Sequence, residues 1–267
     1  MRNKTSLDSL CAALSYAMGI EPPKEAAPAC HELVELIDKR LNGKKVDRII
    51  MYNPDAIAEW IFEKYNNMFQ DIISLTDIAL PFATVMPSVT PVCFGTMYTG
   101  SQPKIHGIQS YAKPVIKIDT IFDALIRYAK KPAIVCTEND SLSKIYLERN
   151  MDYFFYDSAD KVNQKAEELI LKGEHDFIVI YNGNYDSAMH KFGPESDEAL
   201  AELQANIKAY HNFLKLAKES SKDKNTLVGF AMDHGCHEID GNCGSHGLDM
   251  EEDLYIVHLY KLFKSKN

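Results

Sequence analysis

The sequence predicts an α/β fold of three layers, in which a mostly parallel central sheet lies between two layers of helices. Apolar runs of strand length alternate with segments of helical period along the chain, and this order is typical of parallel sheets. The run FIVIY at Phe177–Tyr181 is apolar throughout, as expected of a strand covered on both faces. With 267 residues, 46% of them hydrophobic, the chain can bury such a sheet. We expect one α/β domain over residues 1–267, with a helical segment at residues 1–43 packed on its core.

The periodicity of apolar residues places the individual elements. Strands are expected at Val46–Tyr52, Ala83–Met86, Ala133–Thr137, Tyr153–Tyr156, Phe177–Tyr181, Thr226–Met232 and Leu254–Tyr260. Helices are expected at Ser6–Met18, Ala29–Leu41, Ala56–Tyr65, Ile118–Lys131, Ala159–Leu171 and Ser196–Glu219, with another after Pro91 and a short one after Thr137. Gly19 is the expected C-cap of the first helix, and two prolines then break the chain.

Composition excludes several classes of protein. The net charge of −9 and the absence of a Lys/Arg block argue against nucleic acid as a partner. No apolar run is long enough for a membrane span, and Asp8 interrupts the apolar patch near the N-terminus, which predicts an amphipathic helix instead of a signal peptide. The six cysteines show no CxxC pairing and are expected to be reduced, which indicates the cytoplasm.

Polar residues follow the apolar strands or stand in the loops beyond them. These residues are Asp55, Thr90, Asp186, His190, Asp233, His234 and His246. In a parallel sheet such loops open on one edge, so residues far apart in sequence converge there. Carboxylates and imidazoles suit Zn²⁺ or Mn²⁺, and the set divides naturally into two coordination groups.

Thr90 stands at an expected strand-to-helix turn. Its hydroxyl would face the free N–H groups of a helix N-terminus, where an activated nucleophile and a phosphoryl oxygen can be accommodated. An ordinary N-cap threonine is the alternative explanation, and Asp55, at the start of the helix predicted at Ala56–Tyr65, could likewise be an ordinary N-cap.

Three segments carry most of these polar residues, and they read TPVCFGTMYTGSQPKIHGI, YDSAMHKFGP and MDHGCHEIDGNCGSHG. They resemble motifs of the phosphodiesterase and nucleotide pyrophosphatase branch of the alkaline phosphatase superfamily. The first resembles the threonine-nucleophile motif that ends in TG-x-x-P-x-x-HG, the second D-x-x-x-H-x-x-GP, and the third DHG followed by a later HG. The strand RIIMYNPD is similar to the opening strand that ends in a metal-binding aspartate.

The resemblance implies an alkaline phosphatase-like fold and a metal-dependent phosphoric ester hydrolase in which Thr90 is the nucleophile. Two divalent metal ions are implied, Zn²⁺ in preference to Mn²⁺, held by two sets of residues. The sets are Asp186, His190 and His246 for one ion, and Asp55, Asp233, His234 and Thr90 for the other. The hydroxyl of Thr90 would attack the phosphorus, which would give a phosphothreonine and release the alcohol. Hydrolysis of this intermediate would complete the reaction.

Two departures from that branch concern the substrate. Cys93 and Tyr111 stand where it often has asparagines, so the donors to the phosphoryl oxygens are open, with Tyr111, Lys113 and Cys93 as the candidates for substrate binding. The chain has five arginines, and none has the position of a bidentate clamp for a dianionic phosphate. This favours a singly charged diester or a nucleotide as the small-molecule substrate.

Several alternatives stay open. His237 could replace His246 as a ligand, and Cys236 and Cys243 could bind metal or pair, although bystander thiols are favoured. A phosphomonoesterase or phosphomutase on the same core is a second function, and a non-catalytic metal-binding or ligand-sensing protein is a third. A sulfatase is disfavoured because its Cys/Ser-x-Pro-x-Arg signature is missing. Neither nucleic acid duplexes nor membranes are expected as partners, and the sequence does not indicate an oligomeric state.

Overall fold

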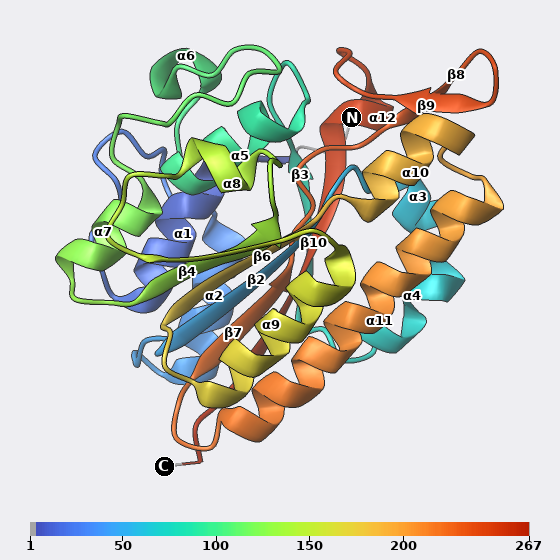
Figure 1. The fold of residues 1–267 in the computed structure, drawn as a ribbon. Coiled ribbons are helices and arrows are strands. Elements are labelled where there is room, and N and C mark those ends of the chain that lie inside the picture. The colour runs from blue at the N-terminus through green and yellow to red at the C-terminus, as the bar shows by residue number, and fades with distance from the viewer. Residues whose placement is uncertain (1–3, 267) are drawn as a thin grey trace.

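The computed structural model describes residues 4–266 and has one large sheet between two layers of helices. Figure 1 shows the sheet nearly edge-on. Eight strands form it in the order β1-β3-β10-β7-β2-β6-β4-β5. Their bounds are β1 (Thr5–Ser6), β2 (Arg48–Pro54), β3 (Ile78–Ala83), β4 (Pro132–Thr137), β5 (Asp152–Tyr156), β6 (Phe177–Asn182), β7 (Thr226–Phe230) and β10 (Tyr255–Phe263). All pairings are parallel except those of β10, which confirms the predicted mostly parallel α/β sheet.

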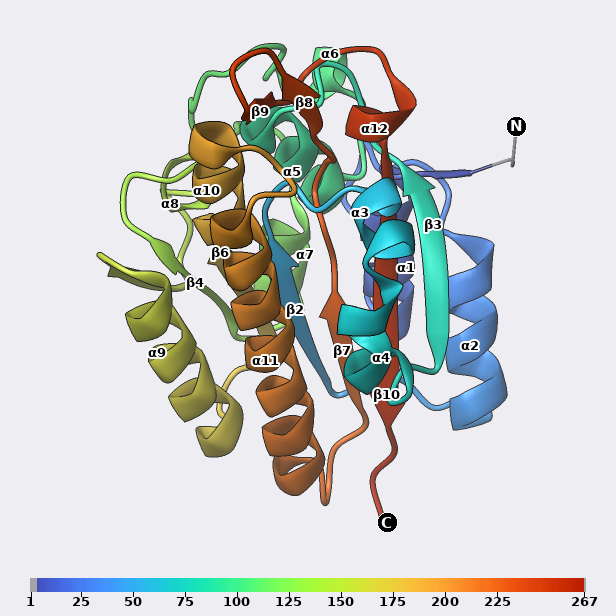
Figure 2. The same cartoon turned by 90° about the vertical axis from the view of Figure 1, so that its right-hand side faces the viewer.

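Helices cover both faces of this sheet. One layer contains α1 (Ser9–Met18), α2 (His31–Leu41), α5 (Thr90–Thr99), α7 (Ile121–Arg127) and α8 (Leu142–Ile145). The other contains α3 (Glu59–Lys64), α4 (Asn66–Ile73), α9 (Ala159–Lys172), α10 (Asn184–Phe192) and α11 (Asp197–Ser220), as Figures 1 and 2 show. Every residue of the central strands β2 and β6 is buried, as two covered faces require.

Sequence signals account for several helix ends. Gly19 ends α1 in the left-handed conformation, as predicted. Thr120 and Asp123 form a reciprocal capping box at the start of α7. The Ser196 side chain accepts from the backbone N–H of Ala199, which caps α11. These local contacts fix where the covering helices begin and end, and with them the loops at the sheet edge.

One strand prediction was wrong in position. A strand was expected at Ala83–Met86, whereas β3 spans Ile78–Ala83 and the following residues form the loop that leads to α5. Pro81 lies inside this strand. It is tolerated because β1 pairs only with Phe82 and Ala83, so β3 has one open side at Pro81 where no N–H is needed.

The loop after β7 contains structure that the sequence analysis did not predict. The strands β8 (His237–Ile239) and β9 (Cys243–Ser245) form an antiparallel hairpin, followed by α12 (Glu251–Leu254). Together with α6 (Pro103–His106), they stand above the carboxyl ends of the parallel strands (Figure 1). No helix in the described part of the chain is both long and apolar enough to cross a bilayer.

Candidate active site

Three neighbouring strands deliver the polar residues to one edge of the sheet. Asp55 directly follows β2, α10 with Asp186 follows β6, and Asp233 follows β7. A buried asparagine ties this edge together: Asn53 donates to the carbonyl of Ala231 (2.6 Å) and accepts from the Tyr98 hydroxyl (2.7 Å). The ends of β2 and β7 and the helix α5 are therefore held in fixed relative positions.

Thr90 is the first residue of α5, and it is 4% exposed. Its Oγ1 lies 3.3 Å from Oδ2 of Asp55 and 3.3 Å from Nε2 of His234. Further along α5, Gly95 leaves room for the ring of His106 in α6: a Cβ there would lie 2.7 Å from that ring. The hydroxyl is thus placed between a carboxylate and an imidazole at the beginning of a helix.

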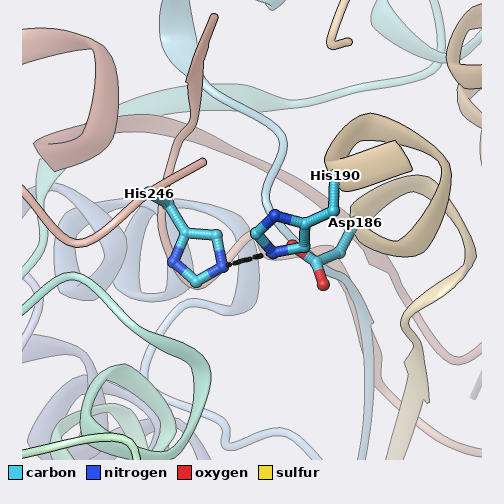
Figure 3. Close-up of side chains that lie close together, drawn as sticks. All are labelled: Asp186, His190 and His246. Atoms are coloured by element: carbon cyan, nitrogen blue, oxygen red, sulfur yellow. Dashed lines mark hydrogen bonds and ion pairs between the residues drawn. The ribbon is translucent and has the colours of Figure 1, made fainter. Parts of the chain in front are cut away.

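The predicted ligand residues lie in two groups, which we call the Asp186 trio and the Asp55 trio. The Asp186 trio consists of Asp186, His190 and His246, and the Asp55 trio of Asp55, Asp233 and His234. Figure 3 shows the Asp186 trio, with two side chains from α10 facing one from the loop after β9. The two trios adjoin, since the ring centroids of His234 and His246 are 4.2 Å apart.

The distances within both trios match the edges of a coordination tetrahedron. In the Asp186 trio, Oδ1 of Asp186 lies 3.2 Å from Nε2 of His190 and 3.3 Å from Nε2 of His246, and the two nitrogens are 3.1 Å apart. In the Asp55 trio, Nε2 of His234 lies 3.3 Å from Oδ1 of Asp55 and 3.3 Å from Oδ2 of Asp233. Ligands about 2.1 Å from a tetrahedral Zn²⁺ would be about 3.4 Å apart.

Backbone carbonyls orient all three histidines of the trios. Nδ1 of His190 lies 2.9 Å from the carbonyl of Gly244, and that of His246 lies 3.1 Å from the carbonyl of Ser88. Nδ1 of His234 lies 2.9 Å from the carbonyl of Gly235. A ring that donates through Nδ1–H presents the lone pair of Nε2, which is the form a metal ligand needs.

Each aspartate has one oxygen without a hydrogen-bond partner, and that oxygen faces the imidazoles. The orphaned buried atoms include Oδ1 of Asp55, Oδ1 of Asp186 and Oδ2 of Asp233. In Asp55 and Asp233 the other oxygen is bound: Oδ2 of Asp55 accepts from the Tyr181 hydroxyl, and Oδ1 of Asp233 accepts from the backbone N–H of Ala56 (3.2 Å). Buried oxygens without a donor are costly, and a cation bound between them would remove that cost. The residues present therefore fit two divalent metal ions.

The electrostatics indicate the same deficit of positive charge. Burial, reinforced by the neighbouring carboxylate of Asp186, raises the pKa of Asp55 to about 7. Burial also raises the pKa of Asp233. The adjacent carboxylate of Asp186 raises the pKa of His190 to about 9. These raised pKa values favour bound protons where a metal ion would supply the positive charge, and metal binding would displace those protons. Burial lowers the pKa of His234 to about 3, so its ring stays neutral, as a metal ligand requires.

Thr90 and Asp55 form the floor of a pocket of about 360 Å³. Its wall includes Tyr111 and Lys113, both predicted substrate-binding residues, together with Asp140 and Asn184, which the sequence analysis did not single out. Tyr111 is 63% exposed, and Nζ of Lys113 lies 5.3 Å from the centre of its ring. These side chains can reach a group bound over Thr90.

Cys93 does not reach this pocket, in contrast to its expected part in substrate binding. It is fully buried one turn into α5, where its sulfur accepts from the hydroxyl of Thr84 (3.1 Å). Burial raises the pKa of its thiol far above the ordinary range, so it stays protonated. Cys236 and Cys243 are both free, and neither belongs to a trio.

The arginines of the described chain contribute nothing to the pocket wall. Arg48 is buried at the opposite edge, where it donates to the carbonyl of Ile170 (2.9 Å) and the hydroxyl of Ser220 (2.7 Å) and so joins the ends of α9 and α11. Arg127 and Arg149 bind aspartates in and before α7, and Arg40 binds Asp77. Lys113 is therefore the cation of the pocket wall.

Two residues near the site have roles that the sequence did not reveal. Tyr181, which the sequence places only at the end of a strand, holds Asp55 in position, because its hydroxyl donates to Oδ2 of that carboxylate. Asp253, which is fully buried, accepts from the backbone N–H of Leu248 (2.8 Å) and lies 2.7 Å from Nδ1 of His237. His237 is thereby directed toward Asp253 and away from the trios, so the structure does not support it as a substitute for His246. The position of Tyr181 at the end of a buried strand, beside the predicted site, was the available signal.

The fold and the two trios define an α/β protein of the alkaline phosphatase superfamily. A sequence profile described as "Type I phosphodiesterase / nucleotide pyrophosphatase" matches residues 128–264, just over half of the chain. The chain belongs to this family. The match includes Asp186, His190, Asp233, His234 and His246, whereas Asp55 and Thr90 lie outside it and join the site only through the fold. No curated protein matches the chain by sequence.

Solved structures share the fold at low sequence identity. Murine ectonucleotide pyrophosphatase/phosphodiesterase 5 superposes with a TM-score of 0.57 at 16% identity, over 73% of this chain and 58% of that one. The phosphonoacetate hydrolase of Sinorhizobium meliloti 1021 gives 0.52 at 15%, over 73% and 59%. The C-terminal periplasmic domain of the phosphoethanolamine transferase EptC from Campylobacter jejuni gives 0.58 at 14%, over 81% and 80%. The chain thus spans less than two thirds of the first two proteins.

Proposed function

We propose that the chain is a two-metal phosphodiesterase that acts through a phosphothreonine on Thr90. The observation that carries this proposal is the placement of the Thr90 hydroxyl, 3.3 Å from both Asp55 and His234, on the floor of an open polar pocket. The Asp55 trio and Thr90 would hold one divalent ion, and the Asp186 trio would hold the other, with Zn²⁺ favoured over Mn²⁺. Such ions would lower the pKa of the hydroxyl and stabilise the charge of the transferred phosphoryl group.

The chain's own residues prepare the displacement. Tyr181 fixes the carboxylate of Asp55, and α5 points its N-terminus at the pocket. Oγ1 of Thr90 would attack phosphorus, the bond to the leaving alcohol would break, and the alcohol would leave with a proton. Water would then attack the phosphothreonine, releasing the phosphate monoester and restoring the threonine.

A singly charged diester suits the pocket better than a dianionic monoester. Lys113 is the cation of its wall, and its Nζ already donates to the carbonyl of Asn139 (3.0 Å). Partial desolvation, together with nearby carboxylates, raises the pKa of the largely exposed Tyr111, so the phenol keeps its proton and can donate to a phosphoryl oxygen. A pyrophosphate-linked dinucleotide, in which each phosphorus carries a single negative charge, is one such substrate. The murine relative has been solved as an inactive variant in complex with AMP, and we extend nucleotide binding to this chain as a proposal.

We also propose the cytoplasm as the compartment. All six cysteines are free and five of them are buried, as expected where thiols stay reduced.

The test compares turnover of bis-p-nitrophenyl phosphate and p-nitrophenyl phosphate by the zinc-loaded and manganese-loaded protein, alongside T90A and T90S. We expect faster turnover of the diester, a loss of at least about a thousandfold in T90A, and partial activity in T90S, which keeps a hydroxyl. Faster turnover of the monoester would indicate a phosphatase or mutase instead. Tight metal binding without turnover of either compound would indicate a sensor.

A further inference from the structure

A second pocket lies at the sheet edge opposite the two trios. Strand β10 is antiparallel to its neighbours, so its last residue, Phe263, pairs with Thr226 at the start of β7. The pocket is bounded by this end of β10, the end of α2, the segment after α4 and the second half of α11. Figure 2 shows these elements at the end of the molecule that carries the C-terminus. Its volume of about 580 Å³ exceeds that of the pocket over Thr90 and falls in the range of small-molecule sites.

The pocket combines an apolar floor with a cationic rim. The apolar side chains that line it are Leu75, Leu214, Leu262 and Phe263. The basic residues that line it are Arg40, His211, Lys215, Lys218, Lys261 and Lys264. None of the ten lining residues is acidic, although Asp and Glu outnumber Lys and Arg by 38 to 29 in the chain. The local excess of positive charge therefore runs against the overall composition.

A single carboxylate beside the pocket binds part of this charge. Oδ1 of Asp77 lies 3.0 Å from Nζ of Lys261 and 3.4 Å from Arg40, and Oδ2 accepts from the backbone N–H of Leu262 (2.8 Å). The side chain of Asp77 is only 9% exposed, so these contacts occupy it. Within the described chain, Lys215, Lys218 and Lys264 have no ion pair. Three ammonium groups are therefore available to a ligand.

The arrangement on α11 places charge directly above apolar surface. His211, Leu214, Lys215 and Lys218 follow the i, i+3, i+4, i+7 spacing of one helix face. Leu214 is buried at 2% exposure, whereas the two lysines beside it are exposed. A ligand lying on this face would contact leucine side chains with one end and ammonium groups with the other.

We propose that this pocket binds a small anionic amphiphile, a molecule with one acidic head group and an apolar chain of medium length. Charge complementarity selects the head group, and the leucine floor with Phe263 selects the chain. A second copy of the protein is a poorer occupant, because a symmetric contact would bring two cationic rims together. A bare inorganic anion would bind the cationic rim but would leave the apolar floor of the pocket in contact with water. The proposal is independent of the chemistry at Thr90.

Isothermal titration calorimetry of the full chain with decanoate tests the proposal. Decylammonium, which keeps the apolar chain and reverses the charge, tests the role of charge. Acetate, which keeps the carboxylate and lacks the chain, tests the role of the chain. The rim variant K215E/K218E is compared with K24E/K104E, which makes the same charge change at exposed lysines outside the pocket. We expect one decanoate per chain, no saturable binding of decylammonium or acetate, and affinity about tenfold weaker in the rim variant only. Thermal unfolding of both variants checks that they are folded.

Three results would overturn the proposal. Equal binding of decanoate and decylammonium would show that charge does not select the ligand. Equal affinities of the two double variants would show that the rim lysines are not involved. Binding of the protein to anionic phospholipid vesicles without saturable binding of decanoate would identify a membrane contact instead of a ligand pocket.

Discussion

At the scale of single residues, the site depends on side chains that hold the ligand residues in place. Tyr181 donates to Oδ2 of Asp55, and this contact leaves Oδ1 of the same carboxylate directed at His234. His190, His234 and His246 are held in the same way by backbone carbonyls. Orienting contacts of this kind contribute to metal affinity although they do not touch the metal.

We predict that Tyr181→Phe weakens metal binding at the Asp55 trio by about 10- to 100-fold and leaves the Asp186 trio unchanged. The reason is that the phenol orients Asp55 and contacts neither histidine of the other trio. Competition with a chromogenic zinc chelator, which resolves two affinities, measures the effect. Tyr210→Phe is the matched control, because its buried hydroxyl contacts the carbonyls of β7 and β10 away from the site. Equal losses in both variants would rule out a specific role for Tyr181.

At the scale of secondary-structure elements, α5, the helix that begins at Thr90, packs closely against α6. Gly95 permits this approach, since a Cβ would lie 2.7 Å from the ring of His106. That ring is held in turn by the hydroxyl of Thr96, 3.1 Å from Nε2. The glycine is needed for space, because its backbone is ordinary helix.

We predict that Gly95→Ala lowers the free energy of unfolding by about 2 kcal/mol, the typical cost of overpacking. An alanine in an unconstrained helix would instead stabilise it by up to about 1 kcal/mol, so the sign of the change is diagnostic. Urea denaturation measures it, and the double variant with His106→Ala serves as the control. In that background the added methyl group has room, and its cost should largely disappear. A cost that persists there would contradict a steric origin.

The sequence predicted the elements that carry strong periodicity and missed those set by tertiary pairing. The prediction of a covered strand at Phe177–Tyr181 is confirmed by β6, in which every residue is buried. It could be made because a short, continuous apolar run is typical of a strand covered on both faces. The direction of β10 was not predictable from its own residues, because it depends on the hairpin that replaces a crossover helix before it. Asp240-Gly241-Asn242 at the tip of that hairpin is a turn signal that could have predicted it. Similarly, the ligand residues were predictable from strand ends, whereas the contact from Tyr181 to Asp55 depends on side-chain directions.

At the scale of the whole molecule, buried neutral histidines link stability to pH. His258 is fully buried, with Nε2 donating to the carbonyl of Met232 (2.7 Å) and Nδ1 accepting from the hydroxyl of Tyr260. Burial lowers its pKa to about 4. Because the unfolded chain binds a proton more readily, with a pKa near 6.5, the stability from this group is complete above that pH. It is lost as the pH falls toward 4.

The free energy of unfolding falls between pH 7.5 and pH 5, and we predict that this fall is about 2 kcal/mol smaller in His258→Gln than in the unchanged protein. The glutamine keeps a donor for Met232 and does not titrate. Urea denaturation at the two pH values gives the loss for each variant. His31→Gln, at an exposed histidine, is the control and should keep the slope of the unchanged protein. An identical slope in His258→Gln would contradict the linkage.

The convergence of the strands at one edge gives the molecule its central property, two adjacent trios beside one hydroxyl. The most direct test is a crystal structure of the zinc-loaded protein with anomalous scattering measured on both sides of the zinc edge. We expect two zinc peaks, one within each trio, with Oγ1 of Thr90 about 2 Å from the ion in the Asp55 trio. A single peak, peaks outside the trios, or a Thr90 hydroxyl turned away from both ions would contradict the account.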